Sequence, residues 1–206
     1  MTLRLNGSNS GFTEVKAPAT AGSNTITLPT SNGSANQYLA NGSTAGELTF
    51  VTPPGSFTSY AIICDEKAEN SNGGTFTSGA WRTRDLNTEI ADPDSIVSIS
   101  SNQFTLGAGS YFIEASAPAY DVDRHQARLY NATTSSSVQV GSSAYADAAN
   151  NVSNSSIVLA RVTITSDTAF EIQHRNVTDG TSNGFGVSSG FGEACIFTVV
   201  KIFKEA

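Results

Sequence analysis

The chain is poor in charged residues. Only 14% of its 206 residues are Asp, Glu, Lys or Arg, against about 25% in an average soluble domain. Lys and Arg number 11 against 18 Asp and Glu, which gives a net charge of −7, and no segment gathers basic residues into a patch. Binding nucleic acid through its phosphates needs clustered Lys and Arg that displace counterions. We therefore expect neutral polar groups to solvate the surface, and no nucleic acid among the partners.

Long apolar runs are missing as well. No stretch reaches the roughly 20 apolar residues that a helix needs to cross a bilayer, so no membrane insertion is expected. The first residues, MTLRLNGSNSG, have no positively charged region followed by an apolar segment, as a secretion signal would. We expect a soluble product made without a signal peptide.

Cysteine is scarce, and the chain holds two, Cys64 and Cys195. Two cysteines so far apart in the sequence cannot build a disulfide framework or a tetrahedral zinc site. The favoured interpretation is two small hydrophobic core residues. The alternative is a bridge, which requires that their strands are neighbours with facing side chains.

Catalytic and metal-binding motifs are also lacking. The chain has no HExxH motif, no Gly-x-Ser-x-Gly elbow and no phosphate-binding loop. Asp121, Asp123 and the pair at 92 and 94 show an Asp-x-Asp spacing, but without the Gly and terminal Glu of a calcium loop. These carboxylates are expected to solvate loops. The sequence therefore predicts no enzyme, no metal site and no cofactor.

The chain is instead rich in short alternations of apolar and polar residues bounded by Gly, Asn and Ser. No helical period of 3.6 residues persists beyond one turn. Closely spaced short strands predict an all-β sandwich or barrel, and the jelly roll is the two-sheet form with eight strands. A loop is expected at 145–156. The expected strands lie at 60–64, 96–99, 103–106, 111–117, 123–131, 137–142, 157–165, 168–175 and 194–203.

Residues 1–54 differ from the rest of the chain. They hold strand-length runs at 3–5, 12–18, 24–29 and 47–51, and few sizeable apolar side chains. So little apolar surface cannot offset chain entropy in a monomer. We expect this leader to dock on another protein or to intertwine with copies of itself. The boundary is expected at Thr52-Pro53-Pro54-Gly55-Ser56, where a rigid Pro pair precedes a Gly, so the domain proper is 55–206.

Residues 60–64 are apolar on both faces, so this strand is expected to be buried on both sides or to pack against another subunit. Together with 196–200, it offers more apolar surface than one sandwich needs. The candidate subunit contacts are Tyr60, Ile62, Phe197 and Val199.

A second cluster surrounds the only tryptophan, where Trp81 is followed by Arg82, Arg84 and Asp85. An Arg-x-Arg-Asp run beside Trp favours internal ion pairing and stacking, and the alternative is an anionic ligand site. Candidate contacts to a glycan on a host surface are Trp81, Tyr120, Tyr145 and the Asn/Ser loops.

Strand alternation permits a prediction about the two histidines. His125 and His174 each share a strand face with apolar residues. Both are expected to point inward as neutral, hydrogen-bonded core residues, close together if their strands are neighbours. Arg124 or Arg128 would then face outward and could pair with Glu171. A metal site with two histidines is conceivable, but no third ligand is evident on that face.

Two stretches resemble bacteriophage proteins. The leader, with FTEVKAP at 12–18, NTITLP at 24–29 and GELTF at 46–50, is similar to a module in tail fibres and other virion proteins, particularly of marine and cyanobacterial phages. The phrase NQFTLGAGSYFIEASA at 102–117, with GAWRTRDLN before it and DRHQARLYN after it, resembles the jelly-roll heads of phage proteins in the tumour necrosis factor (TNF) and complement globular-head class.

This resemblance implies a TNF-like jelly-roll head at 55–206 and a homotrimer. It also implies a virion structural role as a fibre, spike or capsid-decorating subunit, held to other virion proteins through residues 1–54. Eukaryotic members of the class are secreted ligands, but this chain shows neither their signal sequence nor a collagen stalk, so a virion made in the host cytoplasm is the expected setting. The alternative is a receptor- or carbohydrate-binding adhesin module of a tail fibre.

Overall fold

The computed structural model describes residues 3–6, 8–16, 18–20, 22–53 and 57–206. The chain divides into two compact units, 1–54 and 55–206. Three residues of the expected boundary, Pro54, Gly55 and Ser56, lie outside the described residues, as does Ala17 of the leader motif. Among the described residues, no helix is long and apolar enough to cross a membrane.

The first unit contains two β-hairpins. In one, β1 (Leu3–Asn6) pairs with β2 (Phe12–Val15), and in the other, β3 (Tyr38–Asn41) pairs with β4 (Leu48–Val51). The expected run at 24–29 forms no strand and makes only an isolated bridge from Thr27 to Glu47. Much apolar surface stays open to solvent in this unit, because several side chains are 57–68% exposed: Leu3, Leu5, Phe12, Val15, Ile26 and Leu28.

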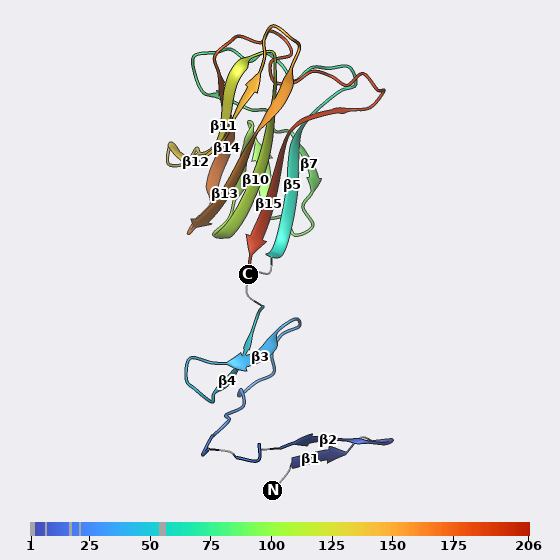
Figure 1. The fold of residues 1–206 in the computed structure, drawn as a ribbon, viewed down its shortest axis with the longest axis vertical. Helices are drawn as coiled ribbons and strands as arrows, with labels where there is room; N and C mark the ends of the chain where they lie inside the picture. Colours follow the sequence, from blue (N-terminus) through green and yellow to red (C-terminus); the bar gives the residue numbers. More distant parts are fainter. Residues whose placement is uncertain (1–2, 7, 17, 21, 54–56) are drawn as a thin grey trace. The chain divides into compact units, whose positions relative to one another are not determined.

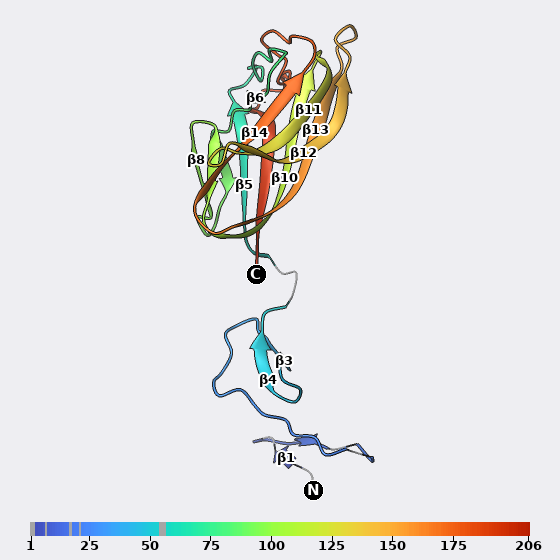
Figure 2. The ribbon, with the colours of Figure 1, turned by 90° about the vertical axis from the view of Figure 1, so that its left-hand side faces the viewer.

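The second unit is a sandwich of two antiparallel sheets that lie face to face as layers (Figure 1 and Figure 2). The first, here the β10 sheet, has the order β13 (Ser153–Ile164), β10 (Gly109–Tyr120), β15 (Cys195–Glu205), β5 (Phe57–Lys67) and β7 (Thr88–Ala91). The second, here the β11 sheet, has the order β12 (Ser136–Ala146), β11 (Asp123–Asn131), β14 (Thr168–Asn176), β9 (Gln103–Leu106) and β8 (Val97–Ser100), and the short β6 (Arg82–Thr83) also pairs with β14.

The chain crosses repeatedly between the sheets, since β9 precedes β10, β10 precedes β11, β12 precedes β13, and β13, β14 and β15 alternate. Eight main strands in two four-stranded layers are the architecture of the jelly roll, with β7 and β8 added at the edges. The predicted all-β jelly-roll fold is confirmed.

The core lies between the two sheets. Burial alternates residue by residue along β10 and β14, as expected for strands with one face on a core. Tyr111 and Ile113 of β10 meet Phe104, Phe170 and the other apolar residues of the β11 sheet there. Each such large side chain contributes about 1.5–3 kcal/mol on burial, so the alternation in the sequence accounts for most of the driving force.

The limits of two strands differ from the sequence prediction. The loop expected at 145–156 is shorter, because β12 continues through Tyr145 opposite Arg124, and β13 begins at Ser153 opposite Tyr120. Backbone pairing with established neighbours extends these strands although their own residues are polar. Residues 76–87, where no strand was predicted, contain the short β6 and a bridge from Phe76 to Gly180.

A β-bulge in β15 corrects the prediction for Phe197. The partners on β5 move from Glu66 to Cys64 while β15 advances from Ile196 to Val199, so β15 carries one extra residue. An extra residue reverses the alternation of faces. Phe197 therefore points into the protomer, on the face of β15 opposite to Val199. Because it is only 8% exposed, it has little surface left for a contact between subunits.

The two cysteines remain free thiols, and both are buried. Their strands are neighbours, but Cys64 lies opposite Val199 while Cys195 lies opposite Lys67. Three residues along a strand span about 10 Å, beyond the limit of about 7 Å between α-carbons for a disulfide. The interpretation as small core residues holds, and the bridge does not form.

Candidate functional site

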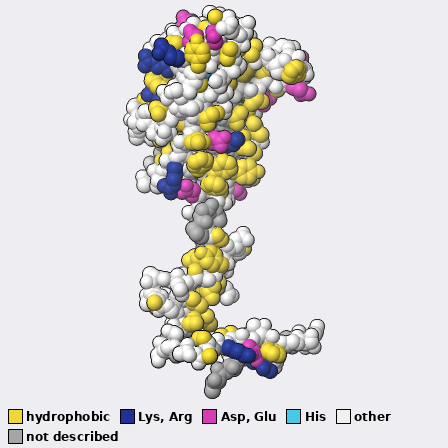
Figure 3. Space-filling model, in the orientation of Figure 1, with side chains coloured by type: hydrophobic (Ala, Val, Ile, Leu, Met, Phe, Trp, Pro, Cys, Tyr) yellow, Lys and Arg dark blue, Asp and Glu magenta, His cyan; other side chains and the backbone are white. Residues whose placement is uncertain are grey.

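The face of the β10 sheet that points away from the core is rich in apolar side chains. Cross-strand pairing aligns Leu159, Glu114, Lys201 and Ile62 in one row, and Arg161, Phe112, Phe203 and Tyr60 in the next. Figure 3 shows hydrophobic side chains gathered over this sheet around one pair of opposite charges. The exposed or half-buried apolar residues of this outer face are Phe57, Tyr60, Ile62, Phe112, Ile157, Leu159, Val199 and Phe203.

Two ion pairs within the protomer lie on this outer face. Lys201 Nζ lies 3.1 Å from Glu114 Oε1, in the middle of the apolar surface. Arg161 Nη2 lies 2.6 Å from Glu205 Oε2 at one side. A partner that covered this face would therefore meet apolar groups and neutralised ion pairs.

Of the four candidate subunit contacts, three lie on this face. Tyr60 is 43% exposed, and Ile62 and Val199 are half-buried. The apolar residues at 60–64 thus lie on both faces of the strand. Ala61 and Ile63 fill the core, while Tyr60 and Ile62 face outward.

The cluster predicted around Trp81 does not form one site, because Arg84 is wholly buried. Its guanidinium donates to Thr198 Oγ1 at 2.7 Å, to the Pro118 carbonyl at 3.1 Å and to the Phe185 carbonyl at 2.9 Å. It also lies 4.2 Å from the centre of the Phe185 ring. Burial lowers the pKa of Arg84 to about 9. With its donors used internally, Arg84 ties the two sheets and the loop before β15 together.

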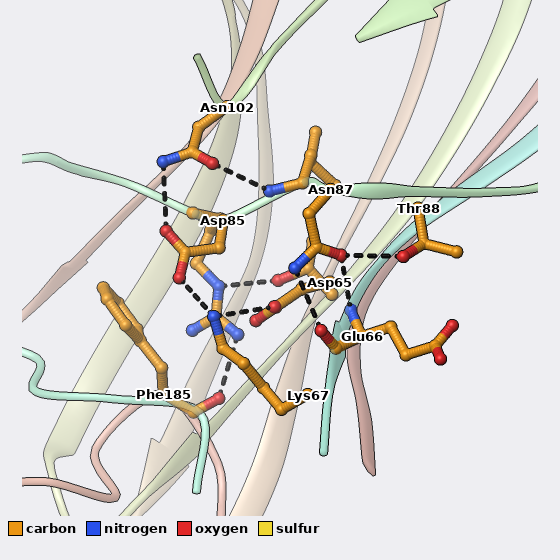
Figure 4. A network of polar contacts seen from close by, with 11 residues as sticks. Asp65, Glu66, Lys67, Asp85, Asn87, Thr88, Asn102 and Phe185 are labelled. Atoms are coloured by element: carbon orange, nitrogen blue, oxygen red, sulfur yellow. Dashed lines mark hydrogen bonds and ion pairs between the residues drawn. The ribbon is translucent and has the colours of Figure 1, made fainter. Parts of the chain in front are cut away.

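Asp85 also has a structural contact. Lys67 Nζ lies between Asp65 Oδ1 at 3.0 Å and Asp85 Oδ2 at 2.5 Å, as Figure 4 shows. Asn102 donates to the other oxygen of Asp85. Burial raises the pKa of Asp65, and the neighbouring Lys67 and Arg84 charges oppose this rise. For Arg84 and Asp85, internal pairing and stacking is therefore the arrangement found.

The two histidines lie inside the sandwich and touch each other. His125 is 4% exposed and His174 is fully buried. His125 Nδ1 lies 2.9 Å from His174 Nε2, and the Phe76 ring covers His174 at a centroid distance of 4.7 Å. Burial lowers the pKa of His125 to about 4 and that of His174 well below its ordinary value, and the Arg84 charge adds to both shifts.

Among the described residues, no three His, Cys, Asp or Glu side chains converge so as to hold a metal ion. The Asp92 carboxylate accepts from the backbone N–H groups of Ile96 and Val97. Asp123 accepts from the Ala148 N–H and the Thr178 hydroxyl. These aspartates thus accept hydrogen bonds from neighbouring turns, whereas the sequence predicted that their carboxylates solvate loops.

A hollow of about 260 Å³ opens on the outer face of the β11 sheet. Arg124 and Gln126 of β11 and Arg175 of β14 reach it from the strands, because these positions alternate with the buried histidines. Trp81, which precedes β6, forms another part of its wall. The lining is Trp81, Arg124, His125, Gln126, Ser143, Ala144, Arg175, Asn176 and Val177.

Arg128 holds Trp81 in place. Its guanidinium lies 4.1 Å from the centre of the Trp81 ring and 4.8 Å from that of Tyr130, and it donates to Gln173 Oε1 at 2.6 Å. The expected ion pair between Glu171 and either Arg124 or Arg128 is not formed. Glu171 instead accepts hydrogen bonds from three neutral side chains, those of Thr83, Gln103 and Gln173.

The sequence pattern alone did not predict this basic surface. Four arginines, Arg82, Arg124, Arg128 and Arg175, come from β6, β11 and β14, which are neighbours in the fold. Arg124 and Arg128 lie four positions apart, and Arg82 and Arg175 lie in other stretches, so no run of basic residues marks them. The alternation of β11 does indicate that residues 124, 126 and 128 face outward. It predicts a basic patch only once the pairing of β11 with β14 is known.

No protein-family model matches the chain, and no curated protein matches it. The chain is similar to solved structures, among them Eiger TNF from S. frugiperda, with 10% identity, a TM-score of 0.48, and coverage of 73% of this chain and 94% of that one. The globular domain of zebrafish complement 1qA gives 16% identity and a TM-score of 0.43, over 70% of this chain and 95% of that one. The PRD1 vertex protein P5 gives 15% and 0.42, over 74% and 100%. These similarities concern the TNF-like jelly-roll fold alone.

Proposed function

We propose that residues 55–206 form a homotrimer whose subunits meet through the outer face of the β10 sheet. The observation that carries this proposal is the apolar surface of that face, where Leu159 is 55% exposed and Phe57 is 52% exposed. Contiguous exposed apolar surface on a folded domain is typical of a binding interface, while single exposed residues are not.

A second copy of the chain is the partner that this face fits. The charged residues in the middle of this face, Lys201 and Glu114, already pair with each other within the protomer, so they need no opposite charge from the other subunit. Interfaces between identical subunits are more apolar than ordinary protein surface and depleted of charge at their centre. The sequence resemblance to trimeric jelly-roll heads agrees with this arrangement.

The trimer is proposed as a virion structural protein, either a fibre or spike subunit or a capsid-decorating subunit. Residues 1–54 would attach it to other virion proteins, since their hairpins leave Leu3, Phe12 and Leu28 open to solvent. Such exposed side chains need a partner to cover them. The resemblance of this leader to phage tail-fibre modules supports the same role.

The test is the oligomeric state of the full chain, measured by light scattering and sedimentation at micromolar concentration. We expect a trimer, and we expect Leu159→Arg to shift it to monomer by burying an unpaired charge in each interface. Val140→Arg is the matched control, because Val140 is 51% exposed and pairs with Arg128 on the β11 sheet. A monomeric wild-type protein, or a trimer that tolerates Leu159→Arg as well as Val140→Arg, would refute the proposed interface.

A second candidate function is that of an adhesin module which binds a host-surface receptor or glycan. The observation that favours it is the hollow beside Trp81, where an aromatic ring and two exposed arginines converge on a face separate from the proposed trimer interface.

A further inference from the structure

We propose that the hollow between Trp81, Arg124 and Arg175 binds a sugar that carries a carboxylate, such as a uronic acid unit of a surface polysaccharide. This inference deepens the adhesin function by naming its ligand class. It does not depend on the trimer, because every residue of the site comes from one protomer.

The two arginines are placed to receive one anion. Arg175 lies directly opposite Gln126 across the β11–β14 ladder, and Arg124 lies two residues before Gln126 on the same face. Arg124 and Arg175 are therefore diagonal neighbours, with about 7–8 Å between their α-carbons. Both side chains line the hollow, so an anion bound there can pair with both guanidinium groups and offset the repulsion between them.

Neither of these two arginines forms a hydrogen bond or an ion pair with a side chain in the described part of the protein. The nearest acid in sequence, Asp123, uses its carboxylate oxygens on the Ala148 N–H and the Thr178 hydroxyl. Elsewhere, Arg84 and Arg161 have their donors engaged by protein oxygens. In a chain with a net charge of −7, two unpaired arginines on one hollow indicate a binding function.

Trp81 supplies the second element, a large apolar surface at the wall of the hollow. The apolar C–H face of a sugar ring packs against an aromatic side chain, and a Trp offers the largest one. Arg128 stacks on Trp81 at 4.1 Å and restricts its motion, so little side-chain entropy is lost on binding. Gln126 and Ser143 lie opposite each other across the β11–β12 ladder and also line the hollow. The Gln126 amide nitrogen donates to the Gly141 carbonyl, which leaves Gln126 Oε1 and the Ser143 hydroxyl to hydrogen-bond sugar hydroxyls.

The size of the hollow selects a small ligand. Its volume of about 260 Å³ lies just under the 300–1,000 Å³ of pockets for drug-sized molecules. Single-stranded nucleic acid would need a groove with several stacking aromatic residues along it. Among the described residues that line this hollow, Trp81 is the one Phe, Tyr or Trp, and the ring of His125 is buried in the sandwich. A carboxylated sugar uses the ring surface and the two charges together.

The experiment uses Trp81 as its own reporter, because it is the only Trp in the chain. The full-length protein is titrated with glucuronate while the Trp fluorescence is recorded, and in parallel with glucose and with acetate. We expect a saturable change with glucuronate at millimolar concentrations, and none with glucose or acetate over the same range. Because the arginines are exposed, we expect the glucuronate affinity to fall when salt is added.

Variants connect this binding to the residues. Arg124→Gln and Arg175→Gln should each weaken glucuronate binding about tenfold, the size expected for the loss of one charge-assisted contact. Arg161→Gln, an exposed arginine on the β10 sheet, should leave the affinity unchanged, as should Leu159→Arg, which tests the trimer separately.

Equal binding of acetate would overturn the proposal in favour of a plain anion site, and equal binding of glucose would show that the arginines do not select the ligand. Tighter binding of thymidine monophosphate than of glucuronate would identify a nucleotide site instead. An affinity that survives both arginine substitutions would also overturn it.

Discussion

The contact between His125 and His174 predicts that the domain loses stability in mild acid. A hydrogen bond of 2.9 Å between two ring nitrogens needs a proton on one and a free lone pair on the other. The pair cannot therefore carry two imidazolium ions in this geometry. The Arg84 guanidinium nearby opposes a positive charge on either ring.

The direction of the effect follows from proton binding. The ordinary pKa of 6.5 applies to each imidazole in the unfolded chain, while burial lowers the pKa of His125 in the folded domain to about 4. Between these values the unfolded chain binds the proton and the folded domain does not, so acidification favours unfolding. The stability associated with His125 is fully present above pH 6.5 and falls as the pH drops toward 4.

The magnitude can be worked from the same pKa values. Each pH unit below 6.5 costs about 1.4 kcal/mol until the folded pKa is reached. Lowering the pH from 7.5 to 5.0 therefore removes about 2 kcal/mol of unfolding free energy through His125. His174, whose pKa is also lowered, contributes a further loss of the same sign.

The assay is urea unfolding at pH 7.5 and 5.0, at one protein concentration so that association does not differ. Carboxylates also titrate over this pH range. On acidification, the raised pKa of Asp65 increases the unfolding free energy, while the lowered pKa of Glu171 decreases it. The double variant His125→Gln and His174→Gln removes the contribution of the histidines to the pH dependence of unfolding and keeps that of the carboxylates. We expect the wild-type protein to lose at least about 2 kcal/mol more than this variant.

Equal losses in the two proteins would refute the reasoning. If the double variant does not fold, an NMR titration of the wild-type imidazoles decides the same point, since the chain has only 2 histidines and both sets of signals belong to this pair. Histidines that titrate near 6.5 in the folded state would contradict the buried, neutral pair.

Three further predictions concern the packing of the domain. Arg84→Met should cost about 3–5 kcal/mol in urea unfolding, because it breaks a buried charged network, and Arg84→Lys should recover only part of this, since an ammonium cannot reproduce the fork of three contacts. Gly184→Ala should lower the unfolding free energy by about 1–3 kcal/mol, because the new Cβ would come within 2.7 Å of a backbone oxygen. Gly107→Ala is the control and should be close to neutral in the same assay, because the atom nearest to its Cβ would lie at 3.7 Å. A thiol reagent at pH 8, followed by mass spectrometry, should modify Cys195 before Cys64, because the Ser188 hydroxyl lowers the pKa of Cys195 while burial raises that of Cys64; modification of Cys64 first would contradict these shifts.

The sequence predicted the parts of the fold that depend on local alternation. Strand β11 occupies 123–131 as expected, and the inward direction of its alternate positions follows from the period of two. The limits of β12 and β13 could not be predicted, because residues around Tyr145 and Ser153 are held in strands by backbone bonds to neighbours rather than by their own apolar pattern.

The candidate sites depended on information that one strand does not contain. The bulge that turns Phe197 inward is defined by its pairing with β5, and nothing in the residues 196–200 marks it. Arg84 has the same spacing from Arg82 as two outward strand residues, but β6 ends at Thr83, so the alternation stops and Arg84 enters the core. The hollow beside Trp81 required the pairing of β14 with both β6 and β11.

The two outer faces of the sandwich differ in a way that joins the two proposals. The outer face of the β10 sheet presents apolar side chains and two ion pairs, while that of the β11 sheet presents Arg124 and Arg175, which form no ion pair, around a hollow. In a trimer that buries the β10 faces, the β11 faces remain in solvent and carry three copies of the hollow. A site for one sugar binds weakly by itself, but linked sites that engage one polysaccharide together can gain a factor of about 10²–10⁴ in avidity. Assembly through the apolar face would thus turn a weak site into an effective attachment surface. The monomeric Leu159→Arg variant should keep its affinity for glucuronate but bind a uronic acid polymer much more weakly than the trimer does.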